Sequence, residues 1–317
     1  MRNRSRTHAG VPLAHAGVCI ALCLVTPAGR LAAQAAGTDT SWAAVDRAMG
    51  RAGAAQPGGV HKYSLPRSDL RVSVGGIAVK PALALGSWVA FERMGAGGDS
   101  AMAMGDLVLL EREVTPVLSK LQQMGVQQTA LHNHLQGESP RLMYLHVEAE
   151  GAPARVAGAL RAALALTGTP PATPAAGAGG ASAPGLDTAA IARALGRSGK
   201  TNGGVYQVSV PRAEAVRVHG LEIPPAMGVA TAINFQPTGG GRAAITGDFV
   251  LTGPEVNPVI RTLRAHGIAV TALHSHLLDE EPEHLYFMHF WAVDDAVRLA
   301  EGLRAALAQM KVPQAAS

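Results

Sequence analysis

The chain has 317 residues, of which 48% are hydrophobic and 16% are charged. This length indicates about two domains, and the composition excludes a largely disordered chain because it provides a sizeable core. The formal net charge is +4, but residues 1–35 hold four arginines and no acidic residue, which leaves 23 basic and 23 acidic residues in the remainder. A neutral chain without a basic tract argues against a nucleic-acid partner or an anionic membrane surface.

The first 35 residues have the layout of a secretory signal peptide. Three arginines precede an apolar run over residues 18–25, and Ala33-Gln34-Ala35 supplies small residues at a cleavage point. The run is shorter than the about 20 residues that span a bilayer. Both cysteines, Cys19 and Cys23, lie in this segment, and neither follows a small residue as a lipid-acceptor cysteine does. The pattern predicts an exported protein, periplasmic or secreted, with no transmembrane segment after signal removal.

The rest of the chain shows the same series of predicted elements twice, which favours an α+β fold of two homologous repeats, each a mostly antiparallel sheet with flanking helices. The first repeat, residues 39–167, is predicted to contain in order a helix at 42–53, a strand around Tyr63, strands near 87–93 and 101–110, a helix at 113–124, strands at 128–135 and 142–150, and a helix at 154–166. Residues 168–185, rich in Ala, Pro and Gly, are predicted to be a flexible linker. The second repeat, residues 186–312, is predicted to repeat the series with a helix at 188–196, a strand around Tyr206, strands near 229–235 and 243–251, and a helix at 255–266.

The repeat is most evident around a histidine motif. Gly105–Pro140 aligns without gaps to Gly247–Pro282, and about half of the positions are identical, far above the roughly one in twenty expected by chance, so the chain is an internal duplication. The segment Thr-Ala-Leu-His-x-His-Leu occurs at 129–135 and again at 271–277. Each copy continues to a third histidine, His146 or His289.

This motif predicts a hairpin that gathers imidazoles. Residues two apart on a strand point to the same face, so His132 and His134 project together. If the two strands pair antiparallel about the loop at 136–141, His134 lies opposite His146 and His132 lies opposite Glu148, with Cβ atoms about 5 Å apart. Glu138 would lie in the loop beside them.

Three imidazoles with one or two carboxylates suit a divalent transition metal (Zn²⁺, Fe²⁺ or Mn²⁺) better than Ca²⁺, which prefers oxygen ligands. In the second repeat either Glu280 or Glu281 replaces Glu138, and Trp291 replaces Glu148. We therefore expect the fuller carboxylate set, and any chemistry, in the first repeat. Gly105-Asp106 and Gly247-Asp248 are interpreted as turns or bulges rather than as further acids at the site. The candidate metal ligands are His132, His134, Glu138, His146, Glu148, His274, His276, Glu280 and His289.

Three functions remain open at this point. The first is an exported protein that binds a divalent metal or another ligand through the histidine hairpins. The second is a metal-dependent enzyme, hydrolase-like or oxygenase-like, in which an open position on the metal activates water and Glu138 or Glu148 acts as general base. The third is a cell-envelope interaction module in which the histidine pairs form a structural hydrogen-bonded network. A small molecule or a cell-envelope component would be the partner.

Several motifs together resemble a known family. Residues 84–88 (Ala-Leu-Gly-Ser-Trp), 104–106 (Met-Gly-Asp), 129–134 (Thr-Ala-Leu-His-Asn-His) and 138–141 (Glu-Ser-Pro-Arg) are similar to the bacterial LppY/LpqO-like family, a domain of unknown function. The resemblance covers nearly all of residues 40–310. It implies an exported bacterial protein, because the family is named after probable lipoproteins, although this chain lacks a suitable lipid-acceptor cysteine. The resemblance assigns no activity and no catalytic residue.

Overall fold

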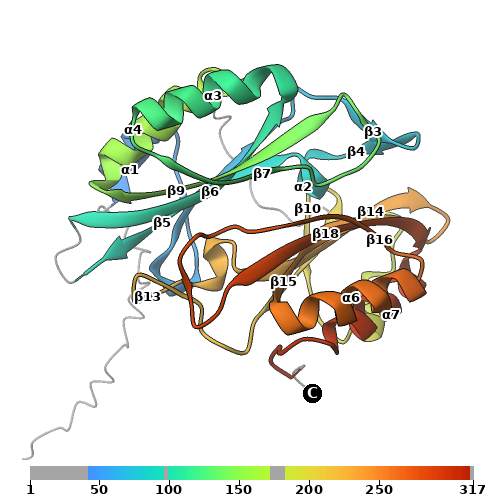
Figure 1. Cartoon of the computed structure of the whole chain (residues 1–317). Coiled ribbons are helices and arrows are strands. Elements are labelled where there is room, and N and C mark those ends of the chain that lie inside the picture. The colour runs from blue at the N-terminus through green and yellow to red at the C-terminus, as the bar shows by residue number, and fades with distance from the viewer. Residues whose placement is uncertain (1–41, 96–98, 172–182, 315–317) are drawn as a thin grey trace, which may run out of the picture. The chain divides into compact units, whose positions relative to one another are not determined.

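Each repeat is built on a six-stranded antiparallel sheet with helices packed on one face (Figure 1). The computed structural model describes residues 42–95, 99–171 and 183–314, and the chain from Ser41 onward forms one unit. The predicted signal peptide and the middle of the predicted linker lie outside the described residues. The predicted fold class, α+β with two homologous repeats, is confirmed.

The first repeat contains four helices, a short 3₁₀ turn and nine strands within the described residues. The helices are α1 (Ala43–Met49), α2 (Pro81–Ala84), α3 (Glu111–Gln123) and α4 (Pro153–Leu164), and the 3₁₀ turn is η2 (Pro57–Gly59). The strands are β1 (Ala54–Ala55), β2 (His61–Pro66), β3 (Val72–Val74), β4 (Ile77–Val79), β5 (Gly86–Met94), β6 (Ser100–Leu110), β7 (Gln127–His132), β8 (Glu138–Ser139) and β9 (Leu142–Gly151). The large sheet has the order β1-β2-β5-β6-β9-β7.

The second repeat follows the same plan. Its helices are α5 (Thr188–Leu195), α6 (Gly253–Ala265) and α7 (Ala296–Leu307), and its 3₁₀ turn is η3 (Pro225–Met227). Its strands are β10 (Lys200–Asn202), β11 (Val205–Pro211), β12 (Arg217–Val218), β13 (Leu221–Glu222), β14 (Ala230–Gly239), β15 (Arg242–Thr252), β16 (Ala269–His274), β17 (Glu280–Glu281) and β18 (Leu285–Asp295). The order β10-β11-β14-β15-β18-β16 matches that of the first sheet position for position.

The helix before each histidine motif has a clear beginning and end. Glu113 in α3 accepts a hydrogen bond from the N–H of Leu110, and Glu255 in α6 accepts one from the N–H of Thr252. A carboxylate at this position satisfies one of the N–H groups that a helix start leaves free. Beyond α3, Gly125 has a φ of 73°, the left-handed conformation that ends many helices and that glycine adopts without strain.

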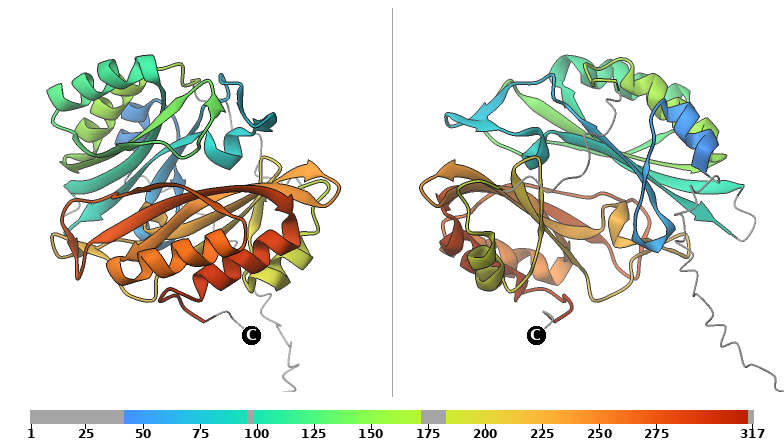
Figure 2. Two further views of the ribbon diagram at one scale, coloured as in Figure 1. Left: turned by 45° about the vertical axis from the view of Figure 1, so that its right-hand side comes forward. Right: turned by 180° about the vertical axis from the view of Figure 1, so that it is seen from behind.

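The two sheets face each other, and the longer helices α1, α3 and α4 and α5, α6 and α7 cover their outer faces (Figure 2). The short helix α2 instead packs against β14 and β15 of the second repeat. Strand β6 shows the two-sided arrangement of the sheets through its alternation. Its odd-numbered residues pack with the helices of the first repeat, whereas Met102 and Met104 contact the apolar cluster that includes Phe287 of the second repeat. Farther along the same face, Val108 belongs to a second cluster that includes Ala244. The faces between the sheets are therefore as buried as those under the helices.

Two small sheets, β4-β3-β8 and β13-β12-β17, were not predicted. Each holds part of the loop that follows a histidine motif. Glu138 lies in β8 opposite Val74, and Glu280 lies in β17 opposite Val218. The glutamates expected in a loop beside the histidines are thus fixed in separate strands.

The predicted register of the histidine hairpin is wrong. In the structure His132 lies opposite Tyr144 and Ala130 lies opposite His146, with a β-bulge between Gln128 and Ala130. Glu148 lies opposite Gln127 instead of His132. The pairing is shifted because β7 already ends at His132 and the connection to β9 at Leu142 includes β8, and the bulge shifts the pairs beyond it once more. Neither feature can be read from the alternation of residue types.

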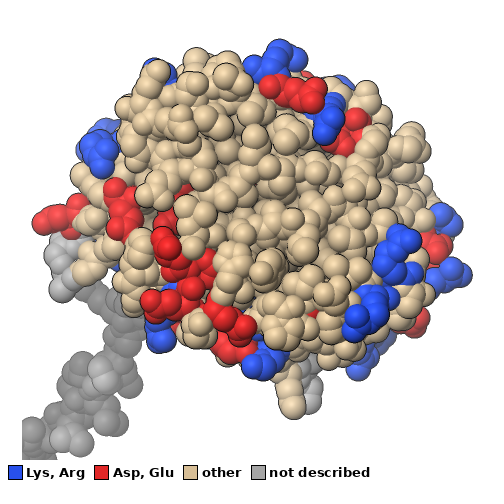
Figure 3. All heavy atoms as spheres, in the orientation of Figure 1, with Lys and Arg blue, Asp and Glu red and all other residues tan. Residues whose placement is uncertain are grey.

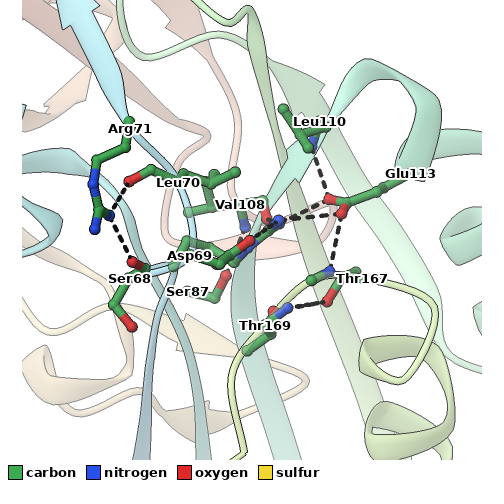
Figure 4. Close-up of polar contacts among 12 residues, drawn as sticks. Ser68, Asp69, Leu70, Arg71, Ser87, Val108, Leu110, Glu113, Thr167 and Thr169 are labelled. Carbon is green, nitrogen blue, oxygen red and sulfur yellow. Dashed lines mark hydrogen bonds and ion pairs between the residues drawn. The ribbon is translucent and has the colours of Figure 1, made fainter.

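Buried ion pairs anchor the start of α3 and of α6. Arg67 is fully buried; its Nη1 donates to the carbonyl of Val108 at 2.8 Å and to Glu113 at 2.7 Å, and its Nε donates to Asp69 at 2.9 Å (Figure 4). Glu113 also accepts from the N–H of Gly168 at 3.0 Å. The network ties a strand end, a helix start and the chain leaving α4 together.

The second repeat has the equivalent network. Arg212 donates to the carbonyl of Val250 at 2.9 Å and to Glu255 at 2.7 Å, and it pairs with Glu214 at 3.1 Å. Glu255 also accepts from the N–H of Lys311 at 2.8 Å. These arginines therefore have an architectural role, since their donors are taken up by groups of the chain itself.

The surface is mixed in character. On the face shown in Figure 3, lysine and arginine side chains lie scattered in small groups, and much of the area carries no charged residue. None of the helices in the described part of the chain is long and apolar enough to cross a membrane.

Candidate metal centre

The six histidines of the two motifs lie together in one cluster. The three shortest ring contacts between the repeats have similar lengths: the centroids of His132 and His274 are 3.6 Å apart, those of His134 and His289 are 3.7 Å apart, and those of His146 and His276 are 3.8 Å apart. The hairpins therefore form one shared site rather than two separate ones.

The contacts within the cluster are related by the duplication. His132 and His274 are equivalent residues and contact each other, while the pair His134–His289 becomes the pair His276–His146 when the repeats are exchanged. Such reciprocity is the mark of two equivalent surfaces packed face to face. The cluster thus lies where the two sheets meet symmetrically.

Two aspartates complete the cluster. Asp106 on β6 lies opposite His146 on β9, and Asp248 on β15 lies opposite His289 on β18. Asp106 Oδ2 is 3.5 Å from His134 Nε2 and 4.0 Å from His146 Nε2. The interpretation of these Gly-Asp pairs as turns or bulges is wrong, because each aspartate is in mid-strand.

The position of Asp106 follows from the alternation along β6. Met104 precedes it on the face toward the other sheet and belongs to one apolar cluster, while Val108 follows it and belongs to the other. On β15, Asp248 lies in the same way between Ala244 and Val250. The polar centre is therefore enclosed by apolar packing on both sides, where water screens charges poorly.

Backbone carbonyls orient two of the imidazoles. His289 Nδ1 is 2.7 Å from the carbonyl oxygen of Gly247, and His276 Nδ1 is 3.2 Å from that of Gly228. Because a carbonyl oxygen only accepts, each Nδ1 carries the proton and donates it. In a neutral ring with its proton on Nδ1, the Nε2 atom keeps its lone pair, which is the arrangement of metal-binding histidines in proteins.

Two short contacts lie at these Nε2 atoms. His276 Nε2 is 3.0 Å from Asp248 Oδ2, and His289 Nε2 is 3.2 Å from His132 Nε2. A proton or a cation between the atoms relieves the first contact. For the second, two nitrogens bound to one tetrahedral ion at about 2.1 Å lie about 3.4 Å apart, close to the observed separation.

Many polar atoms of the cluster are buried without a hydrogen-bond partner. They are Asp106 Oδ1, Asp248 Oδ1, His132 Nδ1, His134 Nε2, His146 Nε2, His276 Nε2 and both ring nitrogens of His274. An unsatisfied buried polar atom costs about 1–3 kcal/mol. So many in one place indicate that the site is built to hold something that supplies partners to all of them.

Burial also keeps the imidazoles in the form that binds metal. Burial, with the neighbouring imidazoles, lowers the pKa of His132 to about 2 and holds the pKa of His134 and of His146 well below the ordinary value of 6.5. Neutral imidazole is the ligand form, so these rings are ready to bind a cation at neutral pH. Burial, and next the charge of Asp248, raises the pKa of Asp106 to about 8.

Within the described residues, four sets of three side chains bring their ligand atoms within 4.8 Å of one another. Each set combines histidines with one another or with one aspartate. The sets are His132–His146–His274, His132–His134–His289, Asp106–His134–His146 and Asp248–His274–His289. The geometry can therefore hold a metal ion with nitrogen and oxygen ligands.

Comparison with known proteins identifies the repeats. A model of the Domain of Unknown Function (DUF1259) matches residues 43–166 and again residues 189–309. The chain belongs to this family. The centre described above is thus made by two DUF1259 repeats of one chain.

Two solved structures show low similarity to the chain. No curated protein matches the chain. Among solved structures, a trimeric bacterial microcompartment shell protein, PduB, shares 14% identity over 83% of this chain and 95% of its own, with a TM-score of 0.22. EtuB from Clostridium kluyveri shares 10% identity over 81% of this chain and 90% of its own, with a TM-score of 0.18. Similarity this low has no bearing on what the DUF1259 repeats do.

The three glutamates predicted as ligands belong to none of the four sets found among the described residues. Glu138 accepts a hydrogen bond from the N–H of Leu142 at 3.3 Å, and Glu280 accepts one from the N–H of Leu285 at 2.6 Å. The two glutamates are thus equivalent and close the loop before β9 and β18, so Glu280 rather than Glu281 corresponds to Glu138. Glu148 lies on β9, and burial raises its pKa.

The aspartates could have been found from the sequence. Both lie in the middle of otherwise apolar predicted strands, 101–110 and 243–251, at equivalent positions of the DUF1259 repeats. A carboxylate in such a strand is costly to bury unless it has a partner. Its recurrence in both copies is the signal that the turn interpretation overlooked.

Proposed function

We propose that this protein is an exported divalent-metal-binding protein whose two DUF1259 repeats form one composite metal centre. The observation that carries the proposal is the convergence of buried, unpartnered ligand atoms from both repeats in one cluster. His276 donates from Nδ1 to the carbonyl of Gly228, yet its Nε2 lies 3.0 Å from Asp248 Oδ2. A divalent cation between these two atoms takes up a lone pair from each.

The ligand atoms favour a particular class of metal. Six imidazoles and two carboxylates surround the centre, and both cysteines of the chain lie in residues 1–35. Nitrogen and oxygen ligands without thiolates suit Zn²⁺, Fe²⁺ or Mn²⁺. Ca²⁺ is a poor fit, because it takes six to eight oxygen ligands.

Export forms part of the proposal. It rests on the arginines, apolar run and small residues of residues 1–35, which favour a periplasmic or secreted protein. We also assign the repeats to the LppY/LpqO-like group that their motifs resemble.

Metal analysis of the purified protein tests the proposal. The full chain is produced in medium containing zinc, iron and manganese, and its metal content is measured beside that of a His132→Ala/His134→Ala variant and a His219→Ala/His266→Ala control. Both control histidines are exposed and outside the cluster. We expect near-stoichiometric metal in the wild type and the control and a loss of at least tenfold in the first variant.

Two results contradict the proposal. One is wild-type protein that carries no metal and takes up none when Zn²⁺, Fe²⁺ or Mn²⁺ is added. The other is equal metal content in the His132→Ala/His134→Ala variant and the control. The first result requires no variant, so it remains decisive even if the double substitution prevents folding.

A further inference from the structure

We infer that the centre holds two metal ions, one bound by Asp106, His134 and His146 and the other by Asp248, His274 and His289. This inference rests on the proposed metal binding and goes beyond it in number and arrangement. The two sets share no residue, and each is drawn from a single repeat. The remaining two sets mix residues of both repeats.

The two sets share an aspartate–histidine pair at equivalent positions and differ in which histidine of the motif is the third member. In each, an aspartate of the central strand is paired across the sheet with a histidine, Asp106 with His146 and Asp248 with His289. The third member comes from the histidine motif of the same repeat, His134 in the first set and His274 in the second. Each repeat therefore supplies two imidazoles and one carboxylate to an ion of its own.

One ion leaves too much of the cluster unsatisfied. A tetrahedral zinc ion takes four ligands, whereas eight side chains converge here. An ion in the first set leaves Asp248 Oδ1 and both ring nitrogens of His274 buried without partners, and an ion in the second leaves those of Asp106, His134 and His146. Because unsatisfied buried carboxylates are costly, a second cation is favoured.

His132 and His276 complete the two coordination shells. His132 belongs to both mixed sets, so it is within reach of either ion. Its Nε2 is 3.2 Å from His289 Nε2, while its Nδ1 is buried and unpartnered. His276 Nε2 contacts Asp248, the carboxylate of the second set, at 3.0 Å. Each ion thus has three ligands from its own set, with His132 within reach of both ions and His276 beside the second.

Stoichiometry tests the inference. Metal-free full-length protein is titrated with Zn²⁺, and bound ions are counted by native mass spectrometry for the wild type, Asp106→Asn, Asp248→Asn and the control Asp294→Asn. Asp294 is outside the cluster and pairs with Arg298. We expect two ions in the wild type and in the control and one in each of the other two variants.

Each alternative result has a definite meaning. One ion in the wild type overturns the two-ion inference but supports the proposed metal binding, and no ion overturns both. Two ions retained by both Asp106→Asn and Asp248→Asn overturn the assignment of one aspartate to each ion.

A spectroscopic measurement tests the inference without any variant. The wild type loaded with two equivalents of Cu²⁺ is examined by electron paramagnetic resonance. Two copper ions in one cluster interact magnetically, so we expect a half-field transition and loss of the isolated-ion spectrum. Two bound ions that show only isolated-ion spectra overturn the inference, because they would not share this centre.

Discussion

Arg67 shows how much of the structure depends on single buried charges. Its guanidinium is completely enclosed, and it satisfies Glu113, Asp69 and the carbonyl of Val108 at once. A proline-arginine pair at a strand end indicates in sequence either an anion-binding or a solvent-exposed arginine. One carboxylate that pairs with Arg67 comes from a helix start 46 residues away, and the other comes from a neighbouring turn. The sequence around Arg67 does not reveal the distant partner, Glu113.

Replacement of Arg67 by alanine is expected to lower the free energy of unfolding by about 3–5 kcal/mol, because it leaves the carboxylate of Glu113 buried without its cation. The matched control is Arg242→Ala, whose pair with Asp294 is 3.6 Å long and largely exposed. Exposed pairs contribute about 0–1 kcal/mol. Urea unfolding measures both changes, and equal losses in the two variants contradict the role given to Arg67.

The same ion pairs make stability depend on pH. Burial alone would raise the pKa of Glu113 and of Glu255, but hydrogen bonds from Arg67 and Arg212 and from backbone N–H groups hold each pKa below the ordinary value of 4.5. The folded chain therefore binds these protons less readily than the unfolded chain. The stability that the pairs provide is present above about pH 4.5 and is lost as the pH falls through the lower folded-state pKa values.

We accordingly expect the free energy of unfolding to fall more steeply below about pH 4.5 in the wild type than in a Glu113→Gln variant. Urea unfolding at a series of pH values between about 6 and 3 measures the slopes. A Glu301→Gln variant serves as control, since Glu301 is exposed on α7. A Glu113→Gln profile parallel to that of the wild type argues against the pair as a source of the acid sensitivity.

At the scale of the elements, the order and type of the main strands and helices follow from alternation, helical spacing and the repeat. The predicted helix at 113–124 corresponds to α3 and the predicted strand at 101–110 to β6. The register of the hairpin does not follow in this way. A bulge between Gln128 and Ala130 and the capture of Glu138 in a separate small sheet both change which residues meet, and turn geometry of this kind leaves little trace in residue type.

Close contact between strands explains the glycine beside each aspartate. A Cβ atom on Gly105 would lie 2.8 Å from the carbonyl oxygen of Trp88, and one on Gly247 would overlap with that of Ala232. Gly247 also accepts the hydrogen bond that orients His289. A side chain at this position would therefore disturb both the sheet and the orientation of a candidate metal ligand.

Gly247→Ala is expected to destabilise the protein by about 1–3 kcal/mol, as overpacking does, and to weaken metal binding. Gly158→Ala provides the matched control, because Gly158 lies within α4 and a Cβ there meets nothing within 4 Å. Alanine in a helix stabilises by about 0.5–1 kcal/mol relative to glycine. Chemical unfolding and a zinc titration of both variants check the contrast; a Gly247→Ala variant as stable as the wild type contradicts it.

For the whole molecule, the duplication was evident in the sequence, but the merging of the two copies was not. Two similar motifs 142 residues apart are as consistent with two separate sites as with one. The outcome is decided by the sheet faces that the helices leave uncovered, where residues such as Met104 and Phe287 must be buried by another layer. Once the two sheets cover each other, the buried aspartates and histidines of one sheet can be paired only with those of the other sheet or with a ligand bound between the sheets.

A metal ion bound as proposed would stabilise both repeats at once. A ligand that binds only the folded chain adds about 2.7 kcal/mol per site at a hundredfold excess over its dissociation constant. For a chain of this size we expect Zn²⁺ to raise the unfolding temperature by about 5 °C or more. The shift is expected in a single unfolding transition, because strands of both repeats contribute to the centre: β6, β7 and β9 from the first and β15, β16 and β18 from the second. Differential scanning calorimetry with and without a chelator measures it. The His132→Ala/His134→Ala variant should show no shift in unfolding temperature with Zn²⁺. If neither Zn²⁺ nor chelator changes the unfolding temperature of the wild type, metal does not stabilise the contact between the repeats.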